Sequence, residues 1–504
     1  MPAGRSRFRD FLPDVLAACT LCVWLAAKLT LFDALEYTSD LISNTQLSLS
    51  VFQGRPLLWD NGFGDHKALH NYYLNPLLAP FTWSLGPIGL FVASALLWMT
   101  AAFALFSVAR GGPAWKRCIY WGISATFLFG PVGFWFFDDY LYGWHAEYLY
   151  LPLGIMFACA LARGSRASWW IAGILLLVRE EGALIVWAIH VLSEWLRPLT
   201  PVRARLVRIA RITAVWALAF IAGLALLFLL RPAHGGARAL NALGFLNTVV
   251  HDPALTRALI WGVEAAAAVM GCGVIVAVSI SWRTSLAALV TMIPLLPPLL
   301  VAACAYDTEF GLREYGFSWG PRLVILWPVL AAALVLSSAY SPDRAPRHRI
   351  ARAALLGAAI LTSLIAQGLV LQEYRSYPFF ERVTAFLPAR RHRFVLARLR
   401  ADEDALLRCL GRSLPSGTPV SSGGSLFARF SRQDIVWPDR TRIAWVQPQL
   451  VVCEVAHRLQ YEYGCTDLAD RLEASGFRKF QLGDITITYA EPLRPWIAGC
   501  AAGR

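Results

Sequence analysis

The stretch "SWWIAGILLLVREEGALIVWAIHVLSEWL", Ser168 to Leu196, decides how many times this chain crosses a membrane. It fits one apolar span that carries three charges, or two short helices that meet at the charged triplet Arg-Glu-Glu at 179–181. A single span would leave these charges near the centre of the bilayer, where each costs about 2.5–3.5 kcal/mol. We therefore predict two helices, 168–178 and 183–196, with the triplet at a membrane surface.

The composition indicates a membrane protein. Of 504 residues, 57% are hydrophobic and only 16% are charged. In soluble domains about 45–50% of the residues are apolar and about 25% are charged. The net charge of +13 could suggest nucleic acid. The basic residues, however, lie in short loops between apolar runs, which is how membrane topology is encoded. We therefore expect a lipid bilayer around the chain and no nucleic-acid partner.

We predict an all-α polytopic domain at 1–371 with eleven spans and a cytoplasmic N-terminus. Basic residues follow every second span, as expected for loops that stay in the cytoplasm. The outer-face loops are then 33–76 and 138–147. The chain has no Asn-x-Ser/Thr sequon, which fits a bacterial inner membrane. The predicted spans are 12–32, 84–108, 119–137, 148–162, 168–178, 183–196, 212–230, 259–280, 286–305, 322–338 and 353–371.

Residues 372–504 would form a small α/β domain outside the cytoplasm. "TPVSSGGSLFARF" (418–430) and "FRKFQLGDITITYAEP" (477–492) show the short alternating runs typical of strands. "DLADRLEASGF" (467–477) is typical of an amphipathic helix ended by Gly476. The cysteines at 409, 453, 465 and 500 allow three pairings, Cys453–Cys465 among them, and free buried thiols are the alternative.

Ionisable residues gather in the predicted outer loops. "NGFGDHKALHNYYLNPLLAPF" (61–81) and "FFDDYLYGWHAEYLYLP" (136–152) bring acids and histidines beside apolar runs. Such groups are costly at a membrane unless they pair, hydrate or line a cavity. We therefore predict a polar pocket at the outer face. Its candidate members are Asp40, Asp65, His66, His70, Asp138, Asp139, His145, Glu147, Arg179, Glu180, Glu181, Glu309 and Arg313.

Each candidate also has a structural alternative. Asp40 could cap the helix that follows it. The acids at 138–139 could form a hydrated loop, and the triplet at 179–181 an internal ion pair. If the two loops share one pocket they must meet, because each buried and unpaired polar group costs about 1–3 kcal/mol.

A metal site is a further alternative within the first loop. His66 and His70 are four residues apart and could share one face of a helix. Together with Asp65 they could bind a divalent metal ion. Two histidines without a fixed third ligand could equally hydrogen-bond to neighbouring groups. The sequence leaves any cofactor unknown.

Three stretches resemble the bacterial membrane family known as domain of unknown function 2079. They are "SDLISNTQLSLSVFQGRPLLWDNGFGDHKALHNYYLNPLLAPF" (39–81), "DDYLYGWHAEYLYLPL" (138–153) and "LLVREEGALIVW" (176–187). The tail stretch "LFARFSRQDIVWP" (426–438) is similar to the outer domain of that family. That family resembles the multi-span C-type glycosyltransferases. The resemblance implies transfer of a sugar from a polyprenyl-phosphate lipid to a cell-envelope acceptor on the periplasmic face.

The resemblance also implies roles for individual residues. A carboxylate would deprotonate the acceptor hydroxyl, and a cation would stabilise the leaving phosphate. Asp40 is the foremost candidate for the base, because it follows the first span. The catalytic candidates are Asp40, Asp65, His66, Asp138, Asp139, His145 and Glu147, and the candidates for binding substrate or phosphate are Arg179, Glu180, Glu181, Arg313 and Arg322.

Two other functions fit a polytopic chain. One is a transporter or flippase for a lipid-linked or anionic substrate, and the other is a non-catalytic membrane scaffold. Transporters often show inverted repeats and helices broken at the middle of the bilayer. This sequence shows no repeat, and its charges lie at one predicted face. A scaffold would not require the cluster at all, so the pattern favours the enzyme.

Overall fold

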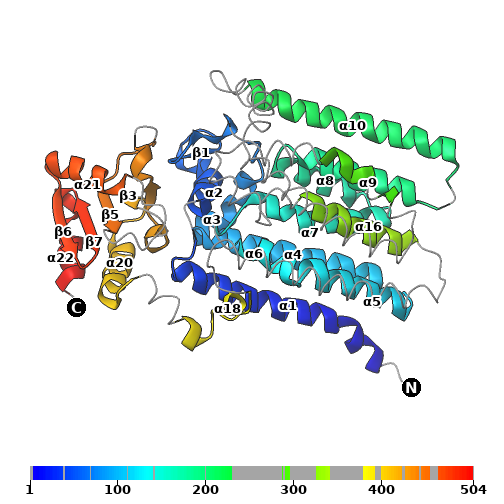
Figure 1. Ribbon diagram of the computed structural model, residues 1–504, viewed down its shortest axis with the longest axis horizontal. Helices are drawn as coiled ribbons and strands as arrows, with labels where there is room; N and C mark the ends of the chain where they lie inside the picture. Colours follow the sequence, from blue (N-terminus) through cyan, green and yellow to red (C-terminus); the bar gives the residue numbers. More distant parts are fainter. Residues whose placement is uncertain are drawn as a thin grey trace, which may run out of the picture.

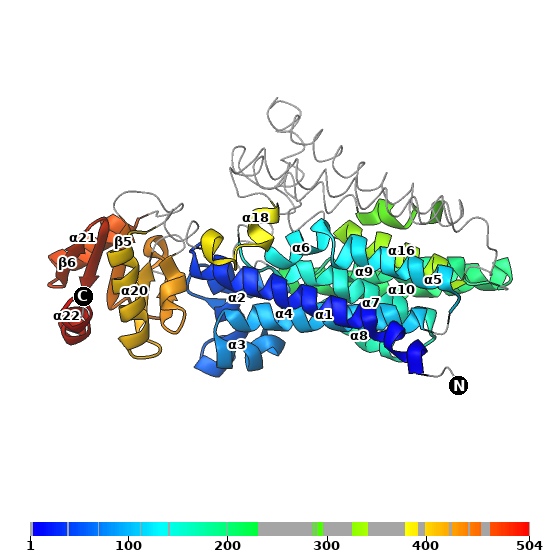
Figure 2. The same ribbon diagram turned by 90° about the horizontal axis from the view of Figure 1, so that it is seen from below.

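Long helices run side by side along the longest axis of the molecule, and a small α/β domain lies at one end of them (Figure 1). The N-terminus lies at the opposite end of this helix bundle (Figures 1 and 2). In this computed structural model the described residues are 4–37, 40–68, 70–110, 112–139, 142–198, 200–229, 286–287, 290–295, 325–340, 379–391, 399–422, 426–441, 444–454 and 464–502.

The described bundle helices coincide with most of the predicted spans. They are α1 (Gly4–Asp33), α4 (Ile88–Ala109), α5 (Ala114–Ile123), α6 (Pro131–Asp138), α7 (Tyr150–Ala162), α8 (Ala167–Val178), α9 (Gly182–Leu196), α10 (Val202–Leu229) and α16 (Leu326–Tyr340). The predicted span 119–137 is divided, because a π-helical turn at Ser124–Leu128 separates α5 from α6.

Three described helices are long and apolar enough to cross a membrane: Phe11–Asp33, Ile88–Ala109 and Val202–Leu226. The other apolar helices of the described part are shorter, α7, α8, α9 and α16 among them. The predicted spans 259–280 and 353–371 lie outside the described residues, and 286–305 lies there in large part. The apolar helices therefore indicate a membrane protein, but they do not support a count of eleven spans.

The charged triplet at 179–181 separates two helices, as the sequence predicts. α8 ends at Val178 and α9 begins at Gly182, while Arg179 has an extended backbone. A Cβ atom at Gly182 would overlap the carbonyl group of Leu175 on α8. The missing side chain thus lets α9 start against the last turns of α8.

α16 forms the centre of this part of the bundle. It packs against α7 and α9, and its residues Leu326–Ser338 are all buried. Gly154 on α7 approaches Pro328 so closely that a Cβ atom there would lie 2.5 Å from the proline Cβ. By contrast, α10 exposes apolar side chains such as Leu218 and Ile221, which suits a helix that faces lipid.

The segment after α1 forms a layer between the bundle and the C-terminal domain (Figures 1 and 2). It begins with α2 (Asp40–Leu49), and the short strands β1 (Trp59–Asp60) and β2 (Gly64–Asp65) pair antiparallel. The 3₁₀ turns η1 (Val51–Gln53), η2 (His66–Ala68) and η3 (Asn75–Leu78) connect these to the short helix α3 (Ala79–Leu85). This layer carries most residues of the first predicted outer loop.

The C-terminal domain is built on a mixed five-stranded sheet in the order β4-β3-β5-β7-β6. β3 is parallel to both β4 and β5, whereas β7 is antiparallel to β5 and β6. The strands are β3 (Pro419–Ser422), β4 (Asp434–Val436), β5 (Leu450–Glu454), β6 (Arg478–Leu482) and β7 (Ile485–Tyr489). The helices are α20 (Ala401–Ser413), α21 (Cys465–Ala474) and α22 (Arg494–Ala502). The short helix α18 (Phe379–Val383) precedes this domain and packs against α1 of the bundle (Figure 1).

Most of the strand and helix predictions for this domain are confirmed. The stretch 477–492 forms the hairpin β6–β7, and α21 ends just before Gly476, which has a φ of 99°. The stretch 418–430 is strand-like only in its first part. Its second part forms a 3₁₀ helix, η8 (Leu426–Phe430), which packs against α20. Leu426, Phe427 and Phe430 are all buried there. Their side chains are buried on one face of a helical turn, whereas a strand would have alternated buried and exposed residues.

Two carboxylates fasten this domain to the rest of the molecule. Asp434 at the start of β4 pairs with Arg55 and accepts a hydrogen bond from Asn61 Nδ2 at 3.0 Å. At the end of α1, Asp33 accepts hydrogen bonds from both terminal nitrogens of Arg408, at 2.6 and 2.9 Å. The domain is therefore held at the end of the bundle where α1 finishes and α2 begins.

Two disulfides cross-link elements of the C-terminal domain. Cys453 on β5 pairs with Cys465 on α21, and Cys409 on α20 pairs with Cys500 on α22. The first pairing is the one that the sequence singled out. The second ties together two helices 91 residues apart in the chain, which no local pattern of residues indicates.

The contact between α20 and η8 gives a stability prediction. A Cβ atom at Gly411 would overlap the carbonyl oxygen of Arg429, whereas one at Gly499 on α22 would meet no atom within 4 Å. Gly411→Ala should therefore lower the free energy of unfolding by about 1–3 kcal/mol, as overpacking does. Gly499→Ala is the matched control and should be neutral or mildly stabilising. Equal unfolding temperatures for the two purified variants would contradict the close approach.

Candidate functional site

Asp40, His145 and Asp139 form a row of charged groups beside the C-terminal domain. The Nδ1 atom of His145 lies 2.8 Å from the carboxylate of Asp139, and its Nε2 atom lies 3.4 Å from that of Asp40. The side chains of Asp139 and His145 are only 3% and 13% exposed, whereas that of Asp40 is 36% exposed. The row therefore runs from a buried acid, through an imidazole, to an acid that solvent can reach.

Local backbone structure builds this row. Asp40 is the first residue of α2, and Asp139 follows the last residue of α6. Asp139 has a φ of 46°, in the left-handed region that Asp tolerates better than most residues. Its carbonyl oxygen accepts a hydrogen bond of 2.7 Å from the backbone of Gly143. This turn brings the chain back so that His145, two residues later, faces Asp139.

His145 should make the stability of the protein depend on pH. Burial alone would lower the pKa of His145, but the carboxylates of Asp139 and Asp40 raise that pKa well above its ordinary value. The unfolded chain loses this proton near pH 6.5, so the stabilisation is complete below about pH 6.5 and disappears as the pH rises through the higher pKa of the folded state.

The unfolding temperature measured from pH 6 to 9 tests this dependence. The wild-type value should fall as the pH rises, because the folded protein must then give up the proton on His145. His145→Gln has no proton to lose and should show a flatter profile. Parallel profiles for the two proteins would mean that His145 is not held as an imidazolium.

A second cluster surrounds Arg179, between α8 and α9. Its guanidinium lies 2.8 Å from Glu147, 3.3 Å from Glu180 and 3.1 Å from Glu181. The hydroxyl of Tyr72 donates a hydrogen bond of 2.8 Å to Glu147. Three carboxylates thus neutralise the charge of Arg179 through its Nε and one terminal nitrogen. The triplet at 179–181 matches the alternative of an internal ion pair.

Asp138 belongs to a separate buried cluster. Its carboxylate accepts hydrogen bonds from the hydroxyl of Tyr37 at 2.6 Å and from Nε of Arg382 at 2.7 Å. Its carbonyl oxygen accepts a hydrogen bond of 2.8 Å from the ammonium group of Lys28. Asp138 and Asp139 are both buried, so they do not form a hydrated loop. Asp138 connects α6 with α1 and α18, and its hydrogen-bond partners differ from those of Asp139.

The predicted metal ligands have different partners. His66 Nδ1 lies 2.6 Å from the buried carboxylate of Asp60, and His70 Nδ1 lies 3.0 Å from Glu180. The side chain of Asp65 is 42% exposed and pairs with Lys67 at 3.4 Å. Within the ranges that the structure describes, no group of three or more His, Cys, Asp or Glu side chains is arranged to hold a metal ion.

The two outer loops meet, through the predicted pair Asp40 and His145 and through the predicted Glu147, but not through Asp65 and His66. Besides the bond from Tyr72 to Glu147, Asn44 donates a hydrogen bond of 3.3 Å to the carbonyl oxygen of Trp144. Asn75 in turn donates one of 2.9 Å to Asn44. The first loop thus reaches the second through Asp40, Tyr72 and the amide of Asn44, while Asp65 and His66 have partners within their own loop.

Sequence reasoning missed several partners of the acids. Tyr37, Tyr72 and Arg382 gave no distinctive pattern, because each meets its partner from a distant part of the chain. Asp60 lies close to its partner His66 in the sequence but was not among the predicted site residues. Lys28 is different, since a lone cation in an apolar span usually pairs or has a function. The predicted site residues Glu309, Arg313 and Arg322 lie outside the described residues.

Comparison with known proteins supplies no relative. Neither the models of protein families, nor the curated proteins, nor the solved structures include a match to this chain. The likeness to domain of unknown function 2079 and to C-type glycosyltransferases therefore stays an expectation from the sequence.

Proposed function

We propose that the chain is an integral-membrane glycosyltransferase. It would move a sugar from a polyprenyl-phosphate lipid to a cell-envelope acceptor. The observation that carries this proposal is the row Asp40–His145–Asp139, in which one partly exposed carboxylate is positioned by an imidazole and a buried acid. Such a row suits acid–base chemistry, because the exposed carboxylate can meet a substrate while the buried members fix its position.

In the proposed reaction Asp40 is the general base. It takes the proton from the acceptor hydroxyl as that oxygen attacks the anomeric carbon of the donor sugar. The bond from the anomeric carbon to the phosphate oxygen breaks, and the polyprenyl phosphate leaves with the electron pair. His145, held by Asp139, donates from Nε2 to Asp40 and is a positioning residue. We assign binding of the leaving phosphate to Arg313 and Arg322, the other two candidate arginines, because Arg179 already has three carboxylate partners.

We further propose that the site faces the periplasm of a bacterial inner membrane, with eleven spans and a cytoplasmic N-terminus. Two disulfides in the C-terminal domain support this orientation, since disulfides persist in oxidising compartments. The row lies at the end of the bundle that carries this domain. The arginine-rich loop between α9 and α10 lies at the other end, which agrees with the excess of basic residues in cytoplasmic loops.

A transfer assay distinguishes the three candidate functions. The purified protein is placed in liposomes with a radiolabelled polyprenyl-phosphate sugar and an envelope extract as acceptor. We expect release of free polyprenyl phosphate together with label on the acceptor, and neither in protein-free liposomes. Movement of intact donor between leaflets without bond cleavage would instead indicate a flippase. If the donor is neither cleaved nor moved by protein that binds it, the enzyme proposal is wrong.

A further inference from the structure

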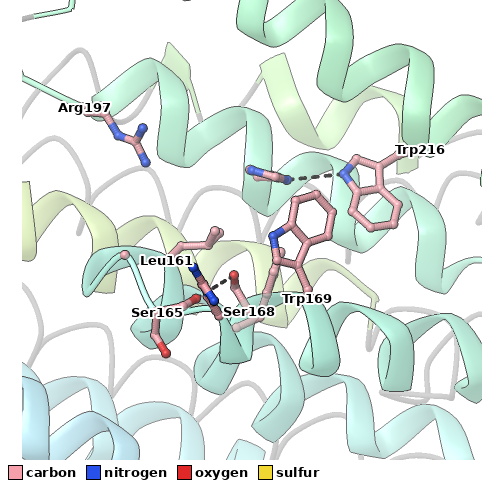
Figure 3. A pocket seen from close by; sticks show the side chains of 10 residues that line it. Leu161, Ser165, Ser168, Trp169, Arg197 and Trp216 are labelled. Carbon is pink, nitrogen blue, oxygen red and sulfur yellow. Dashed lines mark hydrogen bonds between the residues drawn. The ribbon is translucent and has the colours of Figure 1, made fainter.

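A cavity opens between α7, α8, α9 and α10, at the end of the bundle away from the C-terminal domain. It encloses about 190 Å³. Figure 3 shows Trp169 of α8 and Trp216 of α10 side by side at this cavity, with Ser165 and Ser168 near the start of α8. The two indole rings are stacked, with centroids 6.1 Å apart. None of these residues belongs to the proposed transfer site.

The cavity is electropositive. Arg166 and Arg197 both line it, and Arg166 has no ion-pair partner within the part of the chain that the structure describes. Arg197 pairs with Glu194 at 2.8 Å, and Arg208 lies 3.6 Å from the same carboxylate, so one acid meets two cations. α8 also starts here at Ala167, and the positive end of a helix dipole favours an anion. The N–H groups of Ala167, Ser168 and Trp169 themselves donate to Ser165 and Arg166.

A histidine adds a hydrogen-bond donor. An indole N–H can only donate, and Trp216 Nε1 lies 3.3 Å from Nδ1 of His190. Nδ1 of His190 is therefore the acceptor, and the proton of the neutral ring is on Nε2. His190 lines the cavity together with the two arginines and the two serines. Cations, hydroxyl groups and an N–H donor are what a phosphate requires.

The size and surroundings of the cavity point to a lipid. Pockets for drug-sized ligands hold about 300–1,000 Å³, so this one suits a headgroup rather than a whole molecule. Beside it, Trp169 and Trp170 are 60% and 80% exposed, and Leu218 on α10 is 68% exposed. Tryptophans are enriched at membrane interfaces, and an exposed apolar face can lie along acyl chains. Basic pockets between membrane helices are known to bind anionic headgroups.

We propose that this cavity binds the phosphate headgroup of an anionic phospholipid, in the leaflet opposite the proposed transfer site. The acyl chains then lie against the exposed apolar faces of α8 and α10. Such a lipid would bridge the loop between α7 and α8 to the one between α9 and α10, and so stabilise the packing of these helices.

Native mass spectrometry of the full-length protein in detergent tests this site. The probes are phosphatidylglycerol, phosphatidylcholine and inorganic phosphate at equal concentrations. We expect one phosphatidylglycerol to be retained in preference to phosphatidylcholine. Each cation near an anionic lipid contributes about five-fold in affinity. Arg166→Gln should therefore weaken binding about five-fold, and the Arg166→Gln/Arg197→Gln double variant about 25-fold.

Arg203→Gln is the matched control, because Arg203 is an exposed arginine of the same region that does not line the cavity. It should bind phosphatidylglycerol like the wild type. Arg166→Gln leaves every described ion pair intact and remains informative if the double variant does not fold. Equal losses for Arg166→Gln and Arg203→Gln would overturn the proposal, because they would indicate general charge attraction. Displacement of the lipid by inorganic phosphate alone would overturn the lipid assignment in favour of a free anion.

Discussion

Asp40→Asn should reduce the rate of sugar transfer by about 10²–10⁴-fold, the usual contribution of a general base. The amide keeps the shape of the side chain but cannot take a proton from the acceptor hydroxyl. Donor binding should change little, because Asp40 acts on the acceptor. The measurement is a single-turnover rate with labelled donor, together with the donor dissociation constant.

Asp40 also begins α2, so its role as a base must be separated from capping. Asn and Ser are both good N-cap residues, and Asp40→Asn and Asp40→Ser should unfold at nearly the wild-type temperature. Both should nevertheless lose transfer. If transfer by either variant stays within a few-fold of the wild type, Asp40 only caps the helix.

Arg179→Met should lower the free energy of unfolding by about 3–5 kcal/mol at pH 7, because it leaves buried carboxylates without their counter-charge. The side chains of Glu147, Glu180 and Glu181 are at most 17% exposed. Burial raises the pKa of Glu181 even with Arg179 beside it. Chemical or thermal unfolding in detergent measures the loss.

The pH dependence of this variant has a definite sign. Without Arg179 the folded protein binds protons on these glutamates more tightly than the unfolded chain does, so its stability rises as the pH falls from 7 towards 5. Arg179→Met/Glu147→Gln should recover part of the loss at pH 7, because one buried charge is removed. A single variant within about 1 kcal/mol of the wild type at pH 7 would show that the cluster is hydrated rather than buried.

Local signals in the sequence predicted much of the fold. The triplet at 179–181 interrupts an apolar run, and a charge cannot remain in the bilayer centre without a large cost; two helices follow from that alone. The hairpin β6–β7 and the helix α21 likewise follow from alternation and helical periodicity. The stretch 426–430 was mistaken for a strand, because packing against α20 decided its conformation.

The sequence predicted many residues of the candidate site, but not which of them contact one another. The sequence places acids and histidines in two loops, yet it does not indicate which acid meets which base. Asp138 pairs with Arg382, 244 residues away, and Asp434 hydrogen-bonds to Arg55, 379 residues away. No periodicity carries information over such separations. Asp139 and His145, like Asp60 and His66, are close in the sequence, but they lie in short irregular segments, so the tertiary structure is needed to show that they pair.

A structure of Asp40→Asn with a polyprenyl-phosphate sugar bound would show whether Asp40 lies at the site of sugar transfer. This variant should bind the donor without consuming it, so the complex should persist long enough for electron cryomicroscopy. We expect the sugar to lie beside the side chain of residue 40, with His145 still between residues 40 and 139. A donor bound elsewhere, with its sugar touching neither residue 40 nor His145, would mean that Asp40 is not the general base.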